Sequence, residues 1–559
     1  MAEPAVEPAV EFGVEPASYR HWRVDVVGPV ATVTMTVDAD GGLRDDYELK
    51  LNSYDLGVDI ELHDIVQRLR FEHPGVKAVV LTGGLDKIFC SGANIQMLAG
   101  SSHGHKVNFC KFTNETRNEI EEAGAHSGQR WIAAVNGTAA GGGYELALAC
   151  NEILLVDDRA STVSLPEVPL LAVLPGTGGL TRVVDKRHVR RDLADVFATR
   201  SEGLRGQQAL DWRLVDAIAP KSGFDQLVAE RAALCVAASD RPDDGIGIDL
   251  PPLGATTSVD EGSLSARHLD VTVDRDAGLA EFVVRGPVGP QPATAGQLVD
   301  EGADCWLIGA TLELDHAMLH LRFNEPAIGC WTIRTAGSSD AVVAAEAVIE
   351  REPEHWLVRE TQLLWARTLK RLDLSARSVV ALIDEGSCFA GTLAELAIAA
   401  DRSVMLDGER EGSDLPAPSL LLTDANVGWY RMSNGLSRLA TRFWQRDDEY
   451  AAARELIGKD LTADDAARAG LVTFAMDDID WDDEVPVMLA ERASFSPDAL
   501  TAMEANLRFV GPETVETKIF ARLTAWQNWV FQRPNAVGPD GALRRYGTGS
   551  RADFDMKRV

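Results

Sequence analysis

Residues 136–150 read "NGTAAGGGYELALAC", in which three glycines stand directly before a tyrosine, a glutamate and an apolar run of helical character. Glycine lets a backbone approach a ligand closely and leaves its N–H unobstructed by a Cβ atom. An N–H at the start of a helix is also favoured by the helix dipole as a partner for negative charge. The stretch predicts a strand-to-helix turn that holds an anion or an oxyanion, although a turn without any ligand uses the same glycines.

A second glycine turn lies upstream, in "VVLTGGLDKIFCSGANIQML" (79–98), where a strand pattern ends and a helix pattern begins. Ala93 follows Gly92 there, so we expect its N–H to point outward as that of Gly142 does. Two such donors converging on one carbonyl oxygen stabilise a developing enolate, each by about 3 kcal/mol. A bulky residue at Gly142 is expected to abolish activity without unfolding the protein.

Two glutamates complete this candidate site. Glu145 opens the helix after the glycines, and Glu167 lies in the apolar segment "SLPEVPLLAVLPGTGGLTR" (164–182). An unpaired carboxylate in apolar surroundings is costly unless it has a task, although each glutamate alone equally fits a solvated or helix-capping acid. Carboxylates in one apolar pocket have their pKa values pushed apart, so that one accepts and the other donates a proton.

The composition restricts the class of protein. A formal net charge of -32 without a Lys/Arg-rich run argues against a nucleic-acid partner. Seven scattered cysteines without CxxC spacing indicate reduced thiols. The sequence contains no run of 18 apolar residues, so a membrane-spanning helix is not expected. Residues 1–20 are acidic and Pro-rich and are predicted to form a disordered leader. We expect a cytoplasmic protein.

The chain contains a tandem repeat. "ELHDIVQRLRFEHP" (61–74) aligns with "ELDHAMLHLRFNEP" (313–326), and "GLTR" (179–182) aligns with "GLSR" (435–438). Between the copies lies a stretch rich in Pro, Gly, Asp and Ser. The predicted organisation is a leader (1–20), a catalytic domain (21–236), a linker (237–266), a degenerate scaffold domain (267–490) and a C-terminal helical region with a tail (491–559).

Four segments in order resemble the crotonase (enoyl-CoA hydratase/isomerase) superfamily: "FCSGANI" (89–95), "AAVNGTAAGGGYELALAC" (133–150), "LPEVPLLAVLPGTGGLTR" (165–182) and "ALDWRLVD" (209–216). The resemblance implies an α/β fold with a crotonase-like spiral β/α core, here tandemly duplicated and followed by C-terminal helices. It also implies an acyl-CoA substrate whose thioester oxygen accepts from Ala93 and Gly142. The family's acid/base positions fall on Glu145 and Glu167.

The resemblance extends to further residues. Lys50, Leu51 and Asn52 occupy the place where the family wraps a loop around coenzyme A, and Gly92, Asn94 and Gly141 flank the oxyanion amides. Asn94 stands where many members have Asp. Cys110 lies on a polar segment after the Ala93 turn; a lone cysteine is usually inert, but the resemblance implies a third catalytic group there. No metal and no cofactor beyond the substrate's coenzyme A are expected.

The second copy has lost the glycine turns and has no glutamate at the position of Glu167. A double-length chain with one live site resembles the ring-cleaving lyases of aerobic coenzyme A-dependent benzoate degradation. That likeness implies conversion of 2,3-epoxy-2,3-dihydrobenzoyl-CoA, or its dihydrodiol, into 6-oxohex-3-enoyl-CoA and formate. An ordinary enoyl-CoA hydratase or isomerase and a non-catalytic acyl-CoA-binding scaffold remain alternatives. Because the second copy replaces contacts between subunits, we expect a homodimer.

Overall fold

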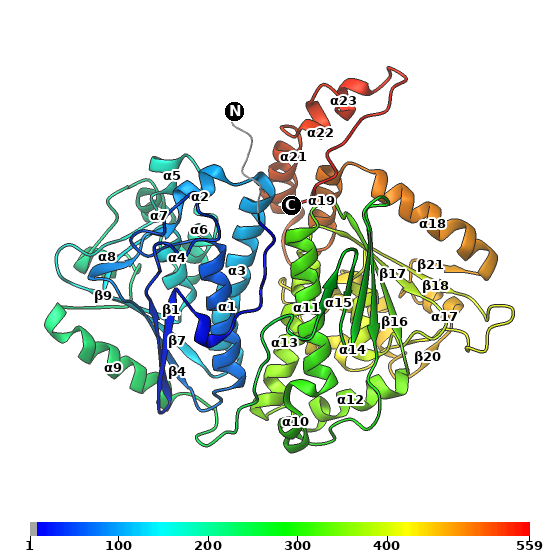
Figure 1. Ribbon diagram of the computed structural model, residues 1–559, viewed down its shortest axis with the longest axis horizontal. Helices are drawn as coiled ribbons and strands as arrows, with labels where there is room; N and C mark the ends of the chain where they lie inside the picture. Colours follow the sequence, from blue (N-terminus) through cyan, green and yellow to red (C-terminus); the bar gives the residue numbers. More distant parts are fainter. Residues whose placement is uncertain (1–7) are drawn as a thin grey trace. The chain divides into compact units, whose positions relative to one another are not determined.

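Two sheets with the same strand order organise the chain, which divides after Pro252 into two units (Figure 1). The structure, a computed structural model, describes residues 8–559. In the first unit the sheet order is β1-β2-β4-β7-β9-β11, with β1 antiparallel to β2 and every later pair parallel. Its strands are β1 (Trp22–Val27), β2 (Val30–Met35), β4 (Ala78–Gly83), β7 (Arg130–Val135), β9 (Glu152–Val156) and β11 (Ala217–Ala219).

Helices cover this sheet because its inner strands are apolar on both faces, as is usual for parallel strands. One face packs against α9 (Lys221–Ala237), with Phe224 and Cys235 in a cluster that includes Val80 and Leu154. The long helices α1 (Leu56–Phe71) and α3 (His103–His126) lie against each other.

Two small sheets in the first unit carry the glycine turns. One has the order β10-β8-β5 and the other pairs β3 with β6. Their strands are β3 (Ser53–Tyr54), β5 (Lys87–Cys90), β6 (Gly92–Ala93), β8 (Gly137–Ala140) and β10 (Val163–Ser164). β8 runs directly into α4 (Gly142–Ala149), so the predicted strand-to-helix turn is present.

The second unit repeats the large sheet, which confirms the duplicated α/β core. Its order is β12-β13-β14-β15-β16-β17-β18-β21, and from β14 onward one antiparallel pair is again followed by parallel pairs. The strands are β12 (Ser258–Asp260), β13 (Ser263–Ser265), β14 (Leu269–Asp274), β15 (Leu279–Arg285), β16 (Cys330–Ala336), β17 (Ser378–Ile383), β18 (Arg402–Leu406) and β21 (Phe474–Met476). Its principal helices include α11 (Trp306–Asn324), α12 (Ser339–Arg351), α13 (Trp356–Asp373), α14 (Gly391–Ala399) and α18 (Asp478–Ser494).

The second unit differs from the first where the small sheets would be. Within residues 253–559, the only such pairing is the two-stranded β19 (Leu420–Leu421) with β20 (Asp460–Leu461), besides a single bridge from Ala390 to Leu421. The copy has therefore kept the sheet that builds the core and lost the sheets that position the glycine turns.

The ends and the linker differ from the predicted organisation. Within the leader, Val10 and Phe12 are buried, and the Phe12 ring lies 5.5 Å from that of Phe112, so residues 8–20 are packed rather than disordered; residues 1–7 lie outside the described part. The linker ends early, because β12 and β13 extend the second sheet.

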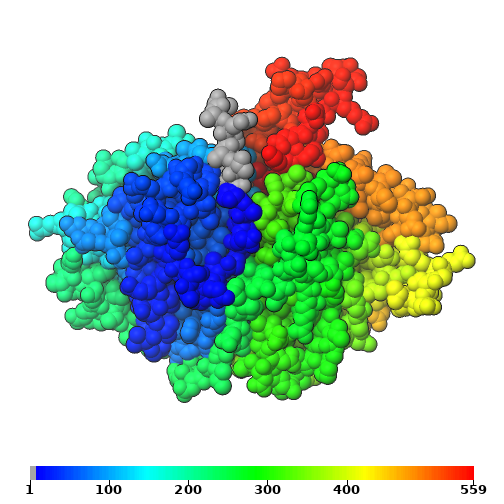
Figure 2. Space-filling view, viewed as in Figure 1, coloured from blue at the N-terminus to red at the C-terminus, as the bar shows by residue number. Residues whose placement is uncertain are grey.

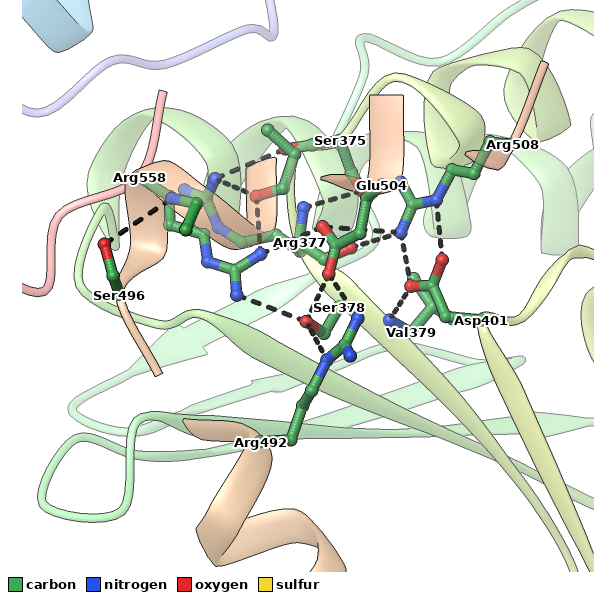
Figure 3. A network of polar contacts seen from close by, with 12 residues as sticks. Ser375, Arg377, Ser378, Val379, Asp401, Arg492, Ser496, Glu504, Arg508 and Arg558 are labelled. Carbon is green, nitrogen blue, oxygen red and sulfur yellow. Dashed lines mark hydrogen bonds and ion pairs between the residues drawn. The ribbon is translucent and has the colours of Figure 1, made fainter. Parts of the chain in front are cut away.

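The C-terminal region is helical, as predicted, with α19 (Pro497–Leu507), a continuous run of α20 (Val515–Thr517), η5 (Lys518–Leu523) and α21 (Thr524–Val530), and the short α22 (Pro534–Val537) and α23 (Ala542–Arg545). The red segment with α22 and α23 protrudes from the body of the second unit (Figure 2). The chain then turns back, and Arg558 is buried among charged groups of that unit (Figure 3), so the predicted tail is anchored at its end. Among residues 8–559 no helix has both the length and the apolarity to cross a bilayer.

Candidate active site

The two glycine turns meet in the first unit. Gly92 adopts φ +92°, and a Cβ atom built on it would lie 2.8 Å from the Ala140 carbonyl oxygen and 3.0 Å from the Gly142 nitrogen. Gly92 therefore leaves open the space in front of the Gly142 amide, which a side chain would close. Ala93 is the next residue of β6, and the Asn94 N–H donates to Tyr54 O (2.8 Å).

Gly142 is the first residue of α4, where the amide of a helix has no acceptor within the helix. Gly141 before it has φ 54° and ψ -128°, a conformation open to glycine, and its N–H donates to Ser164 O (2.9 Å). A Cβ atom on Gly142 itself would overlap the hydroxyl of Tyr54. The expectation that a bulky residue there would act on chemistry alone is therefore wrong, because it would also disrupt buried packing.

Glu145 is held on the first turn of α4 by donors from the segment that follows Glu167. The side chain is buried and accepts from Gly179 N (2.7 Å), Thr177 N (3.0 Å) and the Thr177 hydroxyl. These three hydrogen bonds fix the orientation of the Glu145 carboxylate.

Glu167 begins the short helix α5 (Glu167–Leu171) in a contrasting environment. Burial, with a further contribution from the charge of Glu145, raises the pKa of Glu167 to about 7. Its Oε2 atom is buried and has no partner among the described residues. The pKa of Glu167 thus lies near neutral pH, where its carboxyl group can both hold and release a proton beside the hydrogen-bonded carboxylate of Glu145.

An apolar surface follows Glu167 along the chain. Its exposed side chains are Val168, Leu170, Leu171, Val173 and Leu174. Exposed apolar groups clustered beside titratable ones are typical of a site that receives an apolar ligand.

Cys110 lies on α3 close to this loop. Its sulfur is 3.5 Å from the position of a Cβ atom on Gly176, two residues before the Gly178 turn. Burial, followed by the charge of Glu145, raises the pKa of the Cys110 thiol to about 11. The thiol is therefore protonated near neutral pH and is not a ready nucleophile.

The predicted coenzyme A residues divide into two groups. Lys50 and Leu51 are exposed, and the Lys50 ammonium lies 2.5 Å from a Glu48 carboxylate oxygen. Asn52 is buried, donates to Met35 O and Phe89 O, and accepts from Val37 N. Its side chain is fully used in the fold, which corrects its assignment as a substrate contact.

The Asn94 side chain also has a structural role. Its Oδ1 atom accepts from Met97 N (2.9 Å) and caps α2 (Ile95–Gly100), while Nδ2 donates to Glu48 O (2.8 Å). An Asn at a helix N-cap makes this bond as Asp does, which explains how Asn replaces the Asp of many family members. Its side chain is unavailable to a substrate.

Sequence reasoning missed the groups that hold Glu145 and those behind Gly142. Thr177 and Gly179, which hold Glu145, stand in the glycine-rich segment "PGTGG" (175–179). That segment was the signal in the sequence from which they could have been found. Tyr54, Asp59 and Arg117 are buried below α4, and nothing in their spacing along the chain connects them.

In the second unit, the amide that corresponds to Gly142 N–H already has an acceptor. Gly391, the counterpart of Gly141, keeps a positive φ of 43°, but the next amide, Thr392 N–H, donates to the buried carboxylate of Glu346. Glu395, the counterpart of Glu145, is tied to Arg438 (3.3 Å) and Asn426 (2.8 Å). An internal carboxylate thus occupies the amide that the first unit leaves open.

The chain is similar to known proteins over its first unit and over its whole length. A family described as "Enoyl-CoA hydratase/isomerase" matches residues 48–242. A benzoyl-CoA-dihydrodiol lyase from Aromatoleum evansii is 52% identical over 100% of both chains. The fatty acid oxidation complex subunit alpha of Shewanella loihica is 33% identical over 30% of this chain and 23% of its own. A crystal structure of an enoyl-CoA hydratase from Geobacillus kaustophilus matches 39% of this chain and 75% of its own, with 29% identity and a TM-score of 0.35.

Proposed function

The chain belongs to the family of the benzoyl-CoA-dihydrodiol lyase, and we propose that Glu145 and Glu167 cleave the ring of an oxygenated benzoyl-CoA thioester in its first unit. It is a carbon–carbon lyase of aromatic catabolism in the crotonase superfamily. The observation that carries the residue assignment is that the Glu145 carboxylate, which accepts from Gly179 N–H, lies with Glu167, whose pKa is raised to about 7, beside the open Gly142 amide.

The substrate is 2,3-epoxy-2,3-dihydrobenzoyl-CoA or its dihydrodiol. The epoxide and two waters have the same atoms as 6-oxohex-3-enoyl-CoA and formate, whereas the dihydrodiol needs one water. Of the two oxygenated carbons, C2 adjoins C1, the ring carbon that bears the thioester. Release of C2 as formate breaks both of its ring bonds. The electron pair of C1–C2 passes into a thioester enolate, that of C2–C3 passes into the enol that becomes the aldehyde, and both are then protonated. The N–H groups of Ala93 and Gly142 stabilise that oxyanion.

Glu145 and Glu167 divide the proton transfers. Glu145 takes a proton from water or from the ring hydroxyl, and Glu167 in its protonated form delivers one to the departing oxygen or to the enolate carbon. Cys110, with its protonated thiol, is a candidate donor toward the released fragment. Gly92 and Gly141 keep the backbone open around the carbonyl, and Lys50 and Leu51 remain the candidate coenzyme A contacts. No cofactor beyond the substrate's own coenzyme A is needed for these steps.

A direct assay separates this proposal from its alternatives. The purified protein is incubated with enzymatically made 2,3-epoxybenzoyl-CoA and, separately, with crotonyl-CoA. Formate release from the first supports the lyase, and hydration of the second without formate supports an ordinary hydratase. Binding of both without turnover supports a scaffold protein.

We further propose that the protein works as a homodimer in the cytoplasm. The run Val515–Val530 exposes Ile519, Phe520 and Leu523, three large apolar side chains on one helical segment. Such a surface suits contact with a second copy. The seven cysteines are free thiols, which suits a reducing compartment.

A further inference from the structure

A buried polar cluster of Tyr54, Asp59 and Arg117 lies behind the Gly142 amide. Arg117 on α3 has no exposed surface, and its Nη2 atom donates to the Gly142 carbonyl (3.2 Å) and to the Tyr54 hydroxyl (3.1 Å). Its Nη1 atom lies 3.7 Å from a carboxylate oxygen of Asp59, which also accepts from the Thr113 hydroxyl. The guanidinium therefore connects three elements directly to the first residue of α4.

Burying this cluster costs the fold stability. The Nε atom of Arg117 is buried without a partner among the described residues, and its single ion pair is long. Burial opposes the charge, but Tyr54, Asp59 and Glu145 outweigh it and raise the pKa of Arg117. A buried ion pair of this geometry rarely gains stability over apolar residues of similar volume.

The second unit shows what the same fold contains when no chemistry is done. The repeat that aligns 61–74 with 313–326 places Trp306 and Thr311 at the positions of Tyr54 and Asp59. A second point of alignment lies just after the long helices, where Gly128 follows α3 and Ala376 follows α13, each with a positive φ. Matching these two residues places Trp365 at the position of Arg117. The contacts agree, since the Arg117 guanidinium lies 5.4 Å from the Tyr54 ring and the Trp365 ring lies 5.9 Å from the Trp306 ring.

The silent copy has thus replaced the charged cluster with two tryptophans and a threonine, whose hydroxyl bonds to Leu307 O within its own helix. The packing of α1 against α3, or of α11 against α13, does not require the charges. They are present only in the unit whose glycine turn is open.

We infer that Arg117, supported by Asp59 and Tyr54, is a positioning residue for the oxyanion amide: it fixes the first turn of α4 through the Gly142 carbonyl and places a positive charge behind the enolate. The inference rests on the proposed function of Gly142 and Glu145. A charge held in a water-free site acts on the developing oxyanion far more strongly than it would in water.

Three variants test the role. Arg117→Met removes the charge, and Asp59→Thr/Arg117→Met removes both charges, so that no unpaired carboxylate is left to prevent folding. Arg117→Lys keeps the charge without the paired bonds. The matched control is Arg70→Met, which removes another fully buried arginine, on α1, whose ion pair is with Glu122 (3.1 Å) rather than with the glycine turn.

The readouts are kcat and KM for the epoxide, circular dichroism with thermal unfolding, and the carbonyl stretching frequency of bound benzoyl-CoA. We expect the double variant to fold and bind benzoyl-CoA, with kcat lowered about 10- to 100-fold, KM little changed and the red shift of the carbonyl stretch diminished. Arg117→Lys should recover part of both effects. Arg70→Met should change only thermal stability.

The inference is overturned if the folded double variant keeps the wild-type carbonyl frequency, or if bound benzoyl-CoA shows no red shift in the wild-type protein. Failure of the wild type to release formate refutes the proposed function instead, because the carbonyl frequency is measured on bound benzoyl-CoA without turnover.

Discussion

Glu145 and Glu167 differ in their partners rather than in their residue type. Three donors surround the carboxylate of Glu145, whereas Glu167 has a buried oxygen without any partner among the described residues. On this contrast we propose Glu145 as the base and Glu167 as the acid. The assignment depends on the fold of the "PGTGG" segment, which delivers both Thr177 and Gly179 to one glutamate.

We expect Glu145→Gln and Glu167→Gln each to lower kcat by about 10²- to 10⁴-fold while acyl-CoA binding persists, because each removes one proton-transfer group. Steady-state kinetics and equilibrium binding of benzoyl-CoA measure the two effects separately. The controls are Glu395→Gln and Asp424→Asn in the second unit, which should leave kcat near the wild-type value. A comparable loss in either control would show that the second unit takes part in catalysis.

The raised pKa of Glu167 predicts the pH dependence. If the protonated form is the acid, kcat falls as the pH rises through about 7. The same shift affects stability: Glu167 favours the folded state below its unfolded pKa, and this contribution is lost as the pH rises through about 7. Glu167→Gln should therefore raise the melting temperature relative to wild type above pH 7 but not near pH 4. Equal differences at both pH values would contradict the shift.

A residue with a side chain at Gly142 is predicted to cost stability as well as activity. A Cβ atom there overlaps the Tyr54 hydroxyl, and forcing an extra group into a packed interior costs about 1–3 kcal/mol. Urea unfolding of Gly142→Ala measures this loss. An Ala variant with wild-type stability would show that Tyr54 can move aside.

At the scale of elements, the end of the chain is part of the core of the second unit (Figure 3). Arg558 donates to Glu504 on α19 (3.1 Å) and to the Ala376 carbonyl (3.2 Å), and its own N–H donates to Pro326 O (2.8 Å). Arg492 of α18 donates to the same glutamate (2.8 Å). These bonds fasten two C-terminal helices and the last residues to the loop before β17.

Arg558→Ala should destabilise the protein by about 3 kcal/mol, because it removes one of the cations that pair with the buried Glu504. Guanidinium unfolding monitored by tryptophan fluorescence measures the change. Lys557→Ala, one residue earlier and exposed, is the matched control and should have little effect. Equal effects of the two substitutions would mean that the end of the chain is not anchored by Arg558.

At the scale of the whole molecule, we propose that one copy of the fold performs the chemistry and the other does not. The second unit keeps its large sheet, has no counterpart of the small sheets that carry the glycine turns, and places the Glu346 carboxylate at the amide of Thr392. A chain that tethers two copies of one fold needs fewer partner chains to bring the same number of copies together. A smaller assembly is therefore expected.

Light scattering should give the mass of a dimer, and Phe520→Asp/Leu523→Asp should shift it to a monomer, because two charges would then lie in the apolar surface of Val515–Val530. Gln527→Glu on the same helical run is the control for added charge alone. A hexamer, or a dimer unaffected by the double substitution, would contradict this interface.

Much of the architecture was determined by the sequence alone. Glycine turns, the apolar strand patterns and the repeat are local or periodic signals, so they predicted the α/β core, its duplication and the pairing of the open amides with Glu145 and Glu167. The same signals misassigned Asn52 and Asn94, whose side chains are used by the backbone around them.

The remaining features were decided only by the tertiary structure. The raised pKa of Glu167 depends on burial, the orientation of the Glu145 carboxylate depends on donors more than thirty residues away, and the cluster of Tyr54, Asp59 and Arg117 comes from three separate elements. The burial of Arg558 likewise brings the end of the chain back to residues far upstream. Electrostatic environment and burial are sums over neighbours that are distant in sequence, so no local pattern contains them.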